Sequence, residues 1–111
     1  MSLEGIKSLS VSEQEYIFSY PEIMTVLNVL EAEQIACLGW ELVLRTDDGF
    51  FQHPKEAIIG FSTEQNYDEA NSNFVSRSLL ETKATIESCI QIDTDTYPLE
   101  KMLFCIALDE K

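Results

Sequence analysis

The chain has 111 residues, of which 45% are hydrophobic, enough for one folded domain over residues 1–111 with a single hydrophobic core. It carries seven Lys and Arg against 20 Asp and Glu, so its net charge is −13. This charge argues against direct binding to nucleic acid or to an anionic membrane, because both kinds of contact draw affinity from Lys and Arg. It would instead attract a basic protein, and high solubility without a basic partner is the simpler alternative.

Cysteine usage and the opening residues bear on cellular location. Cys37, Cys89 and Cys105 lie in apolar stretches without a CxxC pair, a pattern typical of buried thiols in a reducing compartment. The opening MSLEGIKSLS lacks the apolar centre of a signal peptide, and no run approaches the roughly 18 apolar residues of a membrane helix. We therefore expect a cytoplasmic protein.

Residues 1–18 form an N-terminal segment with few structural signals. Ser12 and Glu15 have the spacing of a capping box, in which a hydroxyl and a carboxylate satisfy the free N–H groups at a helix start. This spacing predicts one helical turn within SEQEYIF. The rest of the segment cannot be assigned from its pattern.

The first clear element begins at SYPE. Ser19 can cap a helix, Pro21 fits its first turn, and Glu22 lies three residues after the cap. These residues predict a helix over about 20–35. Its apolar stripe follows helical spacing and should be buried; it consists of Ile23, Val26, Leu27 and Leu30.

An alternating pattern in GWELVLRT predicts a strand over 39–45. The core-facing side should consist of Trp40, Leu42 and Leu44. The other side, which we expect to be partly exposed, consists of Glu41, Val43 and Arg45. The only Trp of the chain is therefore predicted to belong to the core.

The Asp-Gly pair at 48–49 tolerates positive φ and predicts a tight hairpin turn. A returning strand is expected through residues 50–51, and it should resume at 57–61. Pro54 cannot donate to a strand ladder, so it indicates an edge, a bulge or a break between two short strands. His53, the only histidine, is expected to be a surface residue of this hairpin.

A second helix is predicted from about 68 to 90. Its buried stripe should consist of Val75, Leu79, Thr82, Ile86 and Ile90. Leu80 lies off this stripe and should stay partly exposed. The apolar run MLFCIAL at 102–108 has the length of a central strand covered on both faces, although periodicity leaves a buried helical segment open.

These elements predict an α+β fold. We expect a small antiparallel sheet of three to four strands packed against two main helices, in the order helix-strand-strand-helix-strand. Both helices should cover one face of the sheet, because each has a single apolar stripe to bury.

The sequence gives no positive sign of catalysis or of a cofactor. A metal site would need ligands beside His53, and the three cysteines lie in stretches that should be buried. The two Asp of DTDT at 93–96 lack the Gly and the distal Glu of a calcium loop, so this stretch is predicted to be a turn before Pro98. We therefore expect no catalytic, metal-binding or cofactor-binding residues.

What remains is a surface rich in acidic and aromatic residues. Tyrosine is a frequent interface anchor, and carboxylates around it complement a basic partner. Taken alone, each Tyr is more often a residue at the edge of the core, because its ring packs while its hydroxyl reaches water. The tyrosines are Tyr16, Tyr20, Tyr67 and Tyr97, and the acidic candidates are Asp47, Asp48, Glu64, Asp68 and Glu69.

Three stretches carry a resemblance to a known family: a helix ending in VLEAEQIACLG, a strand opening on Gly39 with a hairpin after it, and NFVSRSLLETKATIES as the second helix. From about residue 22 to 90 the chain resembles bacterial immunity proteins of polymorphic toxin systems, specifically the immunity family numbered forty. Trp40, Glu41 and Tyr67 stand where that family favours Gly, Asp and Trp.

The resemblance implies a protein that binds and neutralises a cognate toxin by covering its active surface. It adds Glu41 and Tyr67 to the partner-binding candidates. With the acidic residues, the predicted set is Glu41, Asp47, Asp48, Glu64, Tyr67, Asp68 and Glu69. Two other classes stay open: an interaction module for a different basic protein, and a small enzyme that uses carboxylates.

Overall fold

The computed structural model describes residues 3–49, 51–54 and 58–109. Their helices are α1 (Leu3–Leu9), α2 (Glu22–Ala32), α3 (Asn71–Asp93) and a short 3-10 helix, η1 (Leu99–Lys101). Their strands are β1 (Tyr16–Ser19), β2 (Cys37–Arg45), β3 (Phe51–Gln52), β4 (Gly60–Ser62) and β5 (Met102–Leu108). The fold is α+β with an antiparallel sheet, as predicted.

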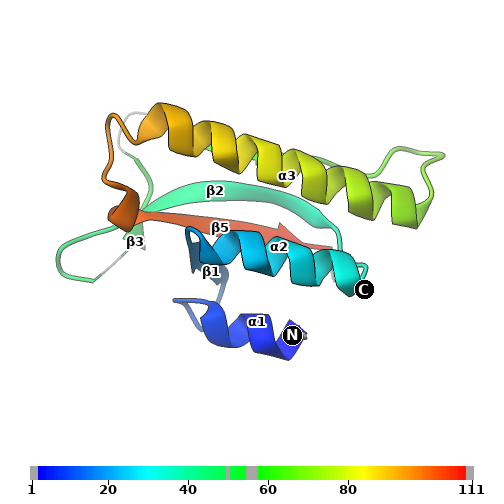
Figure 1. Ribbon diagram of the computed structural model, residues 1–111, viewed down its shortest axis with the longest axis horizontal. Helices are drawn as coiled ribbons and strands as arrows, with labels where there is room; N and C mark the ends of the chain where they lie inside the picture. The colour runs from blue at the N-terminus through cyan, green and yellow to red at the C-terminus, as the bar shows by residue number, and fades with distance from the viewer. Residues whose placement is uncertain (1–2, 50, 55–57, 110–111) are drawn as a thin grey trace.

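The sheet has β5 at its centre, paired with β1 on one side and with β2 on the other (Figure 1). β3 and β4 both pair with the outer side of β2, one after the other along its length. β5 runs through the middle of the sheet, which confirms the central strand predicted at 102–108. Its first half is covered on both faces, whereas Cys105 and Leu108 are partly exposed and Ala107 is exposed.

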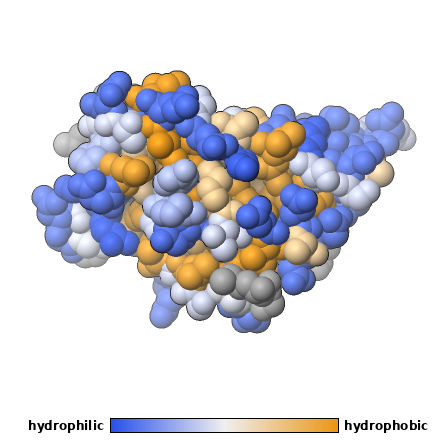
Figure 2. Space-filling model, viewed as in Figure 1, coloured by the Kyte–Doolittle hydropathy of each residue, from blue (hydrophilic) through white to orange (hydrophobic). Residues whose placement is uncertain are grey.

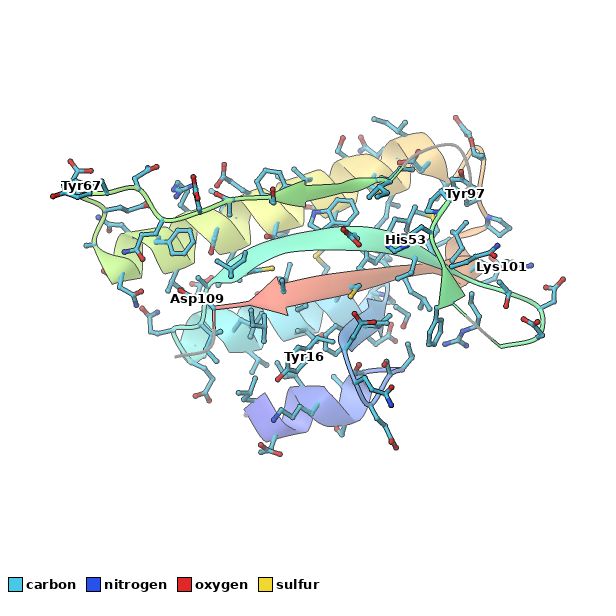
Figure 3. The ribbon with its side chains drawn as sticks, turned by 180° about the vertical axis from the view of Figure 1, so that it is seen from behind. Tyr16, His53, Tyr67, Tyr97, Lys101 and Asp109 are labelled. Carbon is cyan, nitrogen blue, oxygen red and sulfur yellow. The ribbon has the colours of Figure 1, made fainter. Side chains whose placement is uncertain are left out.

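The helices lie on one face of the sheet, with α2 beside α3 and α1 beside α2 (Figure 1). Between this layer and the sheet lies the main core, in which Phe18, Phe74 and Phe104 are among the largest fully buried side chains. The opposite face of the sheet, which we call the open face, has no helix over it within the described ranges (Figure 3). None of the described helices is long and apolar enough to cross a membrane.

The predicted number and order of elements were incomplete, because the N-terminal segment adds α1 and β1. The helical turn predicted within SEQEYIF is wrong, since Tyr16–Ser19 form β1. Ser12 does accept hydrogen bonds from the backbone N–H groups of Gln14 and Glu15, both at 3.3 Å. The capping contact therefore exists, but the chain continues into a strand that pairs with β5.

The boundaries of α2 also differ from the prediction of 20–35. Pro21 holds the N-cap position, and the Ser19 hydroxyl donates 2.7 Å to the Glu22 carboxylate instead of capping the backbone. The helix ends at Ala32 because Gln34 adopts a left-handed φ of 57°, a conformation common just after a helix. The predicted stripe is nevertheless buried.

The alternation predicted along β2 is confirmed on its helix-facing side. Trp40 is 4% exposed and packs edge-on against Phe104, with ring centroids 5.6 Å apart. On the open face the prediction of partial exposure fails for Val43, which is buried with Ile17 and Leu103 in a small second cluster. Glu41 and Arg45 are exposed.

The returning strand is split, as Pro54 indicated. β3 pairs with Leu44 and Arg45, the chain leaves the ladder at His53 and Pro54, and β4 pairs with 39–41. β4 begins at Gly60 and runs to Ser62, so the strand predicted from 57 is shorter on the described side. Residues 50 and 57, which the prediction placed in strands, lie outside the described residues.

α3 runs from Asn71 to Asp93, later at both ends than the predicted 68–90. Its stripe is buried from Val75 to Ile86, and Ile90 is half-buried. Leu80 is 70% exposed, which confirms its predicted position off the stripe.

Candidate functional site

The seven predicted partner-binding residues do not form one patch. Glu64, Tyr67, Asp68 and Glu69 belong to residues 63–70 between β4 and α3, which we call the 63–70 loop. Asp47 and Asp48 lie in the β2–β3 turn, near Lys101 at the opposite end of a molecule 43 Å long (Figure 3). Hydrophilic residues gather at both ends, with hydrophobic ones between them over the helix layer (Figure 2). Glu41 lies between the two groups, on the open face.

Arg77 of α3 holds the 63–70 loop in place. All five N–H donors of its guanidinium are used, with distances of 2.8–2.9 Å. Two go to the Glu69 carboxylate in parallel, the bidentate arrangement that makes Arg–carboxylate pairs strong. The other three go to the Thr63 hydroxyl, the Glu64 carbonyl and the Glu81 carboxylate.

Glu69 completes this network from inside the loop. Its carboxylate also accepts from the backbone N–H of Asn66 at 3.1 Å, and its carbonyl accepts from the Gln65 side chain at 2.8 Å. The Arg77 hydrogen bonds, followed by the Asn66 bond, lower the pKa of Glu69 from 4.5 to about 2. Only 12% of its side chain is exposed, so Glu69 acts inside the loop instead of offering its charge to a partner.

The same loop presents Tyr67 to solvent. Tyr67 is the most exposed large hydrophobic residue described, with a relative exposure of 107%, and it lies at one extreme of the molecule (Figure 3). Glu64 and Asp68 on either side of it are exposed as well. The loop therefore combines a held backbone with an outward aromatic ring and two neighbouring carboxylates.

The β2–β3 turn is less negative than its sequence implies. Lys101 donates 2.7 Å to the Asp47 carboxylate, and this contact raises the pKa of Lys101. Asp48 accepts a short hydrogen bond from the Thr46 hydroxyl. The Lys101 contact neutralises the charge of Asp47, and the Thr46 hydrogen bond occupies the carboxylate of Asp48. Less negative charge is therefore available to a partner at this turn.

Glu41 has a neighbour that the sequence did not reveal. Its Oε2 lies 2.9 Å from Nε2 of His53, and both side chains are about half exposed, at 52% and 49%. His53 is a surface residue of the hairpin, as predicted, and it contacts Glu41 because the chain leaves the ladder after β3.

The open face also carries a groove of about 530 Å³, which we call the open-face groove. It crosses the sheet from residues 14–16 to Phe61 and Ser62, and Cys105 lies on its floor between Glu15 and Glu41. Burial first, and then the charges of Glu15 and Glu41, raise the pKa of Cys105 to about 11. Sequence reasoning missed Glu15, because it assigned that residue to a helical turn.

The described residues offer no activated nucleophile among their thiols. Burial raises the pKa of Cys37, and burial with Asp93 raises that of Cys89 to about 12, so both stay protonated at neutral pH. No group of three or more His, Cys, Asp or Glu in the described ranges could hold a metal ion.

Compared with known proteins, the chain matches no family model, no curated protein and no solved structure.

Proposed function

We propose that the protein is a non-catalytic acidic module that binds a basic protein, and that it serves as an immunity protein which neutralises a cognate bacterial toxin. The observation that carries the proposal is the 63–70 loop. It places the fully exposed Tyr67 between Glu64 and Asp68 on a backbone held by Arg77.

A held loop favours binding because little freedom is lost when a partner arrives. Tyr is enriched among the residues that dominate interface energetics, and carboxylates around it repel acidic groups while they attract Lys and Arg. The net charge of −13 supports the choice of a basic partner, since it speeds the encounter of opposite charges.

The immunity role is supported by the resemblance over about 22–90, in which Tyr67 takes the position of a family Trp. Many toxin domains are nucleases, whose substrate-binding surfaces are basic. An acidic protein that covers such a surface would block access of the nucleic acid without any chemistry of its own. A neighbouring gene for a long secreted protein with a C-terminal toxin domain is the expected genetic context.

The test begins with a pull-down from the native organism and identification of the basic protein that co-purifies. Binding of that purified protein is then measured for Tyr67→Ala, for which we expect at least a tenfold loss of affinity. Leu80→Ala is the matched control, because Leu80 is exposed on α3 outside the loop. Equal affinities for the two variants would remove the loop from the proposal.

The immunity role has its own readout. Cells that express the co-purifying protein should stop growing, and co-expression of this chain should restore growth, whereas Tyr67→Ala should restore it less well. A partner that is not toxic would leave the binding module in place and reject the immunity role. Affinity should also fall as salt rises, because exposed charges are screened over about 10 Å at 0.1 M ionic strength.

A further inference from the structure

The open-face groove has a floor with small side chains and walls with charged ones. Gly39 of β2 and Ala107 of β5 are register partners that line it, and both are small residues. Glu15 stands on the β1 side and Glu41 on β2. At about 530 Å³, its volume falls within the roughly 300–1,000 Å³ of pockets that hold ligands.

Neither Glu15 nor Glu41 forms an ion pair with a Lys or Arg among the described residues. In the described part of the chain, the Glu15 carboxylate forms no hydrogen bond or ion pair; only its backbone groups are bonded. Glu41 has His53, which carries charge only when protonated. Both carboxylates act on Cys105 on the floor, where burial first and then the charges of Glu15 and Glu41 raise the pKa of the thiol.

We propose that the open-face groove receives an extended segment of the basic partner, with a Lys or Arg side chain lying between Glu15 and Glu41. The small residues on the floor leave room for a main chain, and the carboxylates complement one cationic side chain. The inference rests on the proposed function for the basic character of the partner, but the groove itself is separate from Tyr67.

The groove and the 63–70 loop are continuous in the chain. β4 ends at Ser62, which lines the groove, and Thr63 begins the loop that Arg77 holds. A partner segment that crosses the open face toward β4 would therefore arrive beside this loop. One partner can occupy both surfaces, so we expect each to contribute to its affinity.

The groove can be tested before the partner is known, with a synthetic heptapeptide of alternating Lys and Val as the probe. Backbone amide shifts of the labelled protein should move around Gly39, Cys105 and Ala107. Glu15→Gln and Glu41→Gln should each weaken the peptide at least fivefold. Glu87→Gln is the matched control, because Glu87 is exposed on α3. Circular dichroism would show that all three variants are folded.

Cys105 provides a second readout. Iodoacetamide modification of Cys105, located by mass spectrometry, should slow at least threefold when the Lys-Val peptide is bound. The same peptide with Glu in place of Lys should not protect the thiol. Equal weakening by all three Gln variants, or shifts confined to other surfaces, would overturn the inference, because general attraction to an acidic protein then explains the binding.

The purified partner separates this inference from the proposed function. If Tyr67→Ala weakens the partner and the Glu15 and Glu41 variants do not, the groove is not the site and the binding module stands. If the groove variants weaken the partner and Tyr67→Ala does not, the groove is supported and the loop is rejected. Peptide affinity should be unchanged by Tyr67→Ala in either case.

Discussion

The indole nitrogen of Trp40 donates a 2.8 Å hydrogen bond to the Thr85 hydroxyl, which links β2 to α3. The same hydroxyl lies within hydrogen-bond distance of the Glu81 and Thr82 carbonyl oxygens. Because Trp40 is 4% exposed, Thr85→Val would leave the indole N–H without this acceptor. We expect the free energy of unfolding to fall by about 1–3 kcal/mol, measured by urea denaturation.

Thr85→Ser keeps the hydroxyl and is the control for this substitution, with an expected loss below about 1 kcal/mol. A double-mutant cycle with Trp40→Phe isolates the bond itself, since neither partner then remains unsatisfied. If Thr85→Val and Thr85→Ser were equally stable, the hydrogen bond would have no net effect on folding.

The Glu69–Arg77 pair makes stability depend on acid pH. The pKa of Glu69 is about 2 in the folded protein against an ordinary value of 4.5, so the unfolded chain takes up its proton first as pH falls. The contribution of the pair is present above about pH 4.5 and is lost as pH falls toward 2. Glu69→Gln should therefore flatten the decline of the unfolding temperature between pH 5 and 2.5.

Glu64→Gln is the control for that titration, because Arg77 contacts the Glu64 carbonyl and not its carboxylate. It should keep the pH dependence of the original protein. A decline as steep in Glu69→Gln as in the original would show that other carboxylates dominate acid unfolding.

Two glycines should respond differently to alanine. A Cβ at Gly60 would collide with the Trp40 carbonyl oxygen, which is main chain and cannot move aside without disturbing the ladder between β2 and β4. We expect Gly60→Ala to cost about 1–3 kcal/mol. Gly49 has open space around it but a φ of +86°, so Gly49→Ala should cost only about 1 kcal/mol.

Urea denaturation of both variants checks this ranking. Amide exchange adds a second readout, since Gly60→Ala should release protection along β4 and its partners 39–41, whereas Gly49→Ala should not. Equal costs would mean that the close approach of the two strands relaxes easily.

Cys105 should be a slow nucleophile whose pKa depends on the groove carboxylates. A pKa of about 11 against an ordinary 9.0 lowers its thiolate fraction near neutral pH on the order of a hundredfold. Glu15→Gln and Glu41→Gln should each lower this pKa, because each removes a negative charge that disfavours the thiolate. The pH dependence of the alkylation rate measures the shift.

Glu87→Gln should leave that profile unchanged, because Glu87 lies on α3 and not beside the groove. High salt should reduce the difference between the original protein and the two groove variants. An identical profile in every variant would leave burial as the whole cause of the raised pKa.

The sequence predicted the elements that have long periodic patterns. The stripes of α2 and α3 and the alternation along β2 each extend over several residues, so their buried faces could be identified. α1 and β1 could not, because a helix of seven residues and a strand of four carry too few positions for a period. β1 is fixed by its pairing with β5, which no local pattern reveals.

The candidate site shows the same division. Exposure of Tyr67 could be anticipated from its place in a polar loop. The role of Glu69 could not, because it depends on Arg77, eight residues away and in the next element. Glu15 and Cys105 approach one another because β1 pairs with β5. The groove could therefore not be predicted from the sequence without knowledge of this strand pairing.

The central place of β5 determines when this protein can fold during synthesis. β1 pairs only with β5 among the described strands, so it must wait for residues 102–108 before it gains a neighbour. On the ribosome the first 93 residues can form α2 and α3, but the sheet stays divided until β5, the last of the described strands in chain order, inserts between β1 and β2. Release of residues 102–108 from the exit tunnel is therefore the expected point at which the nascent chain becomes resistant to protease.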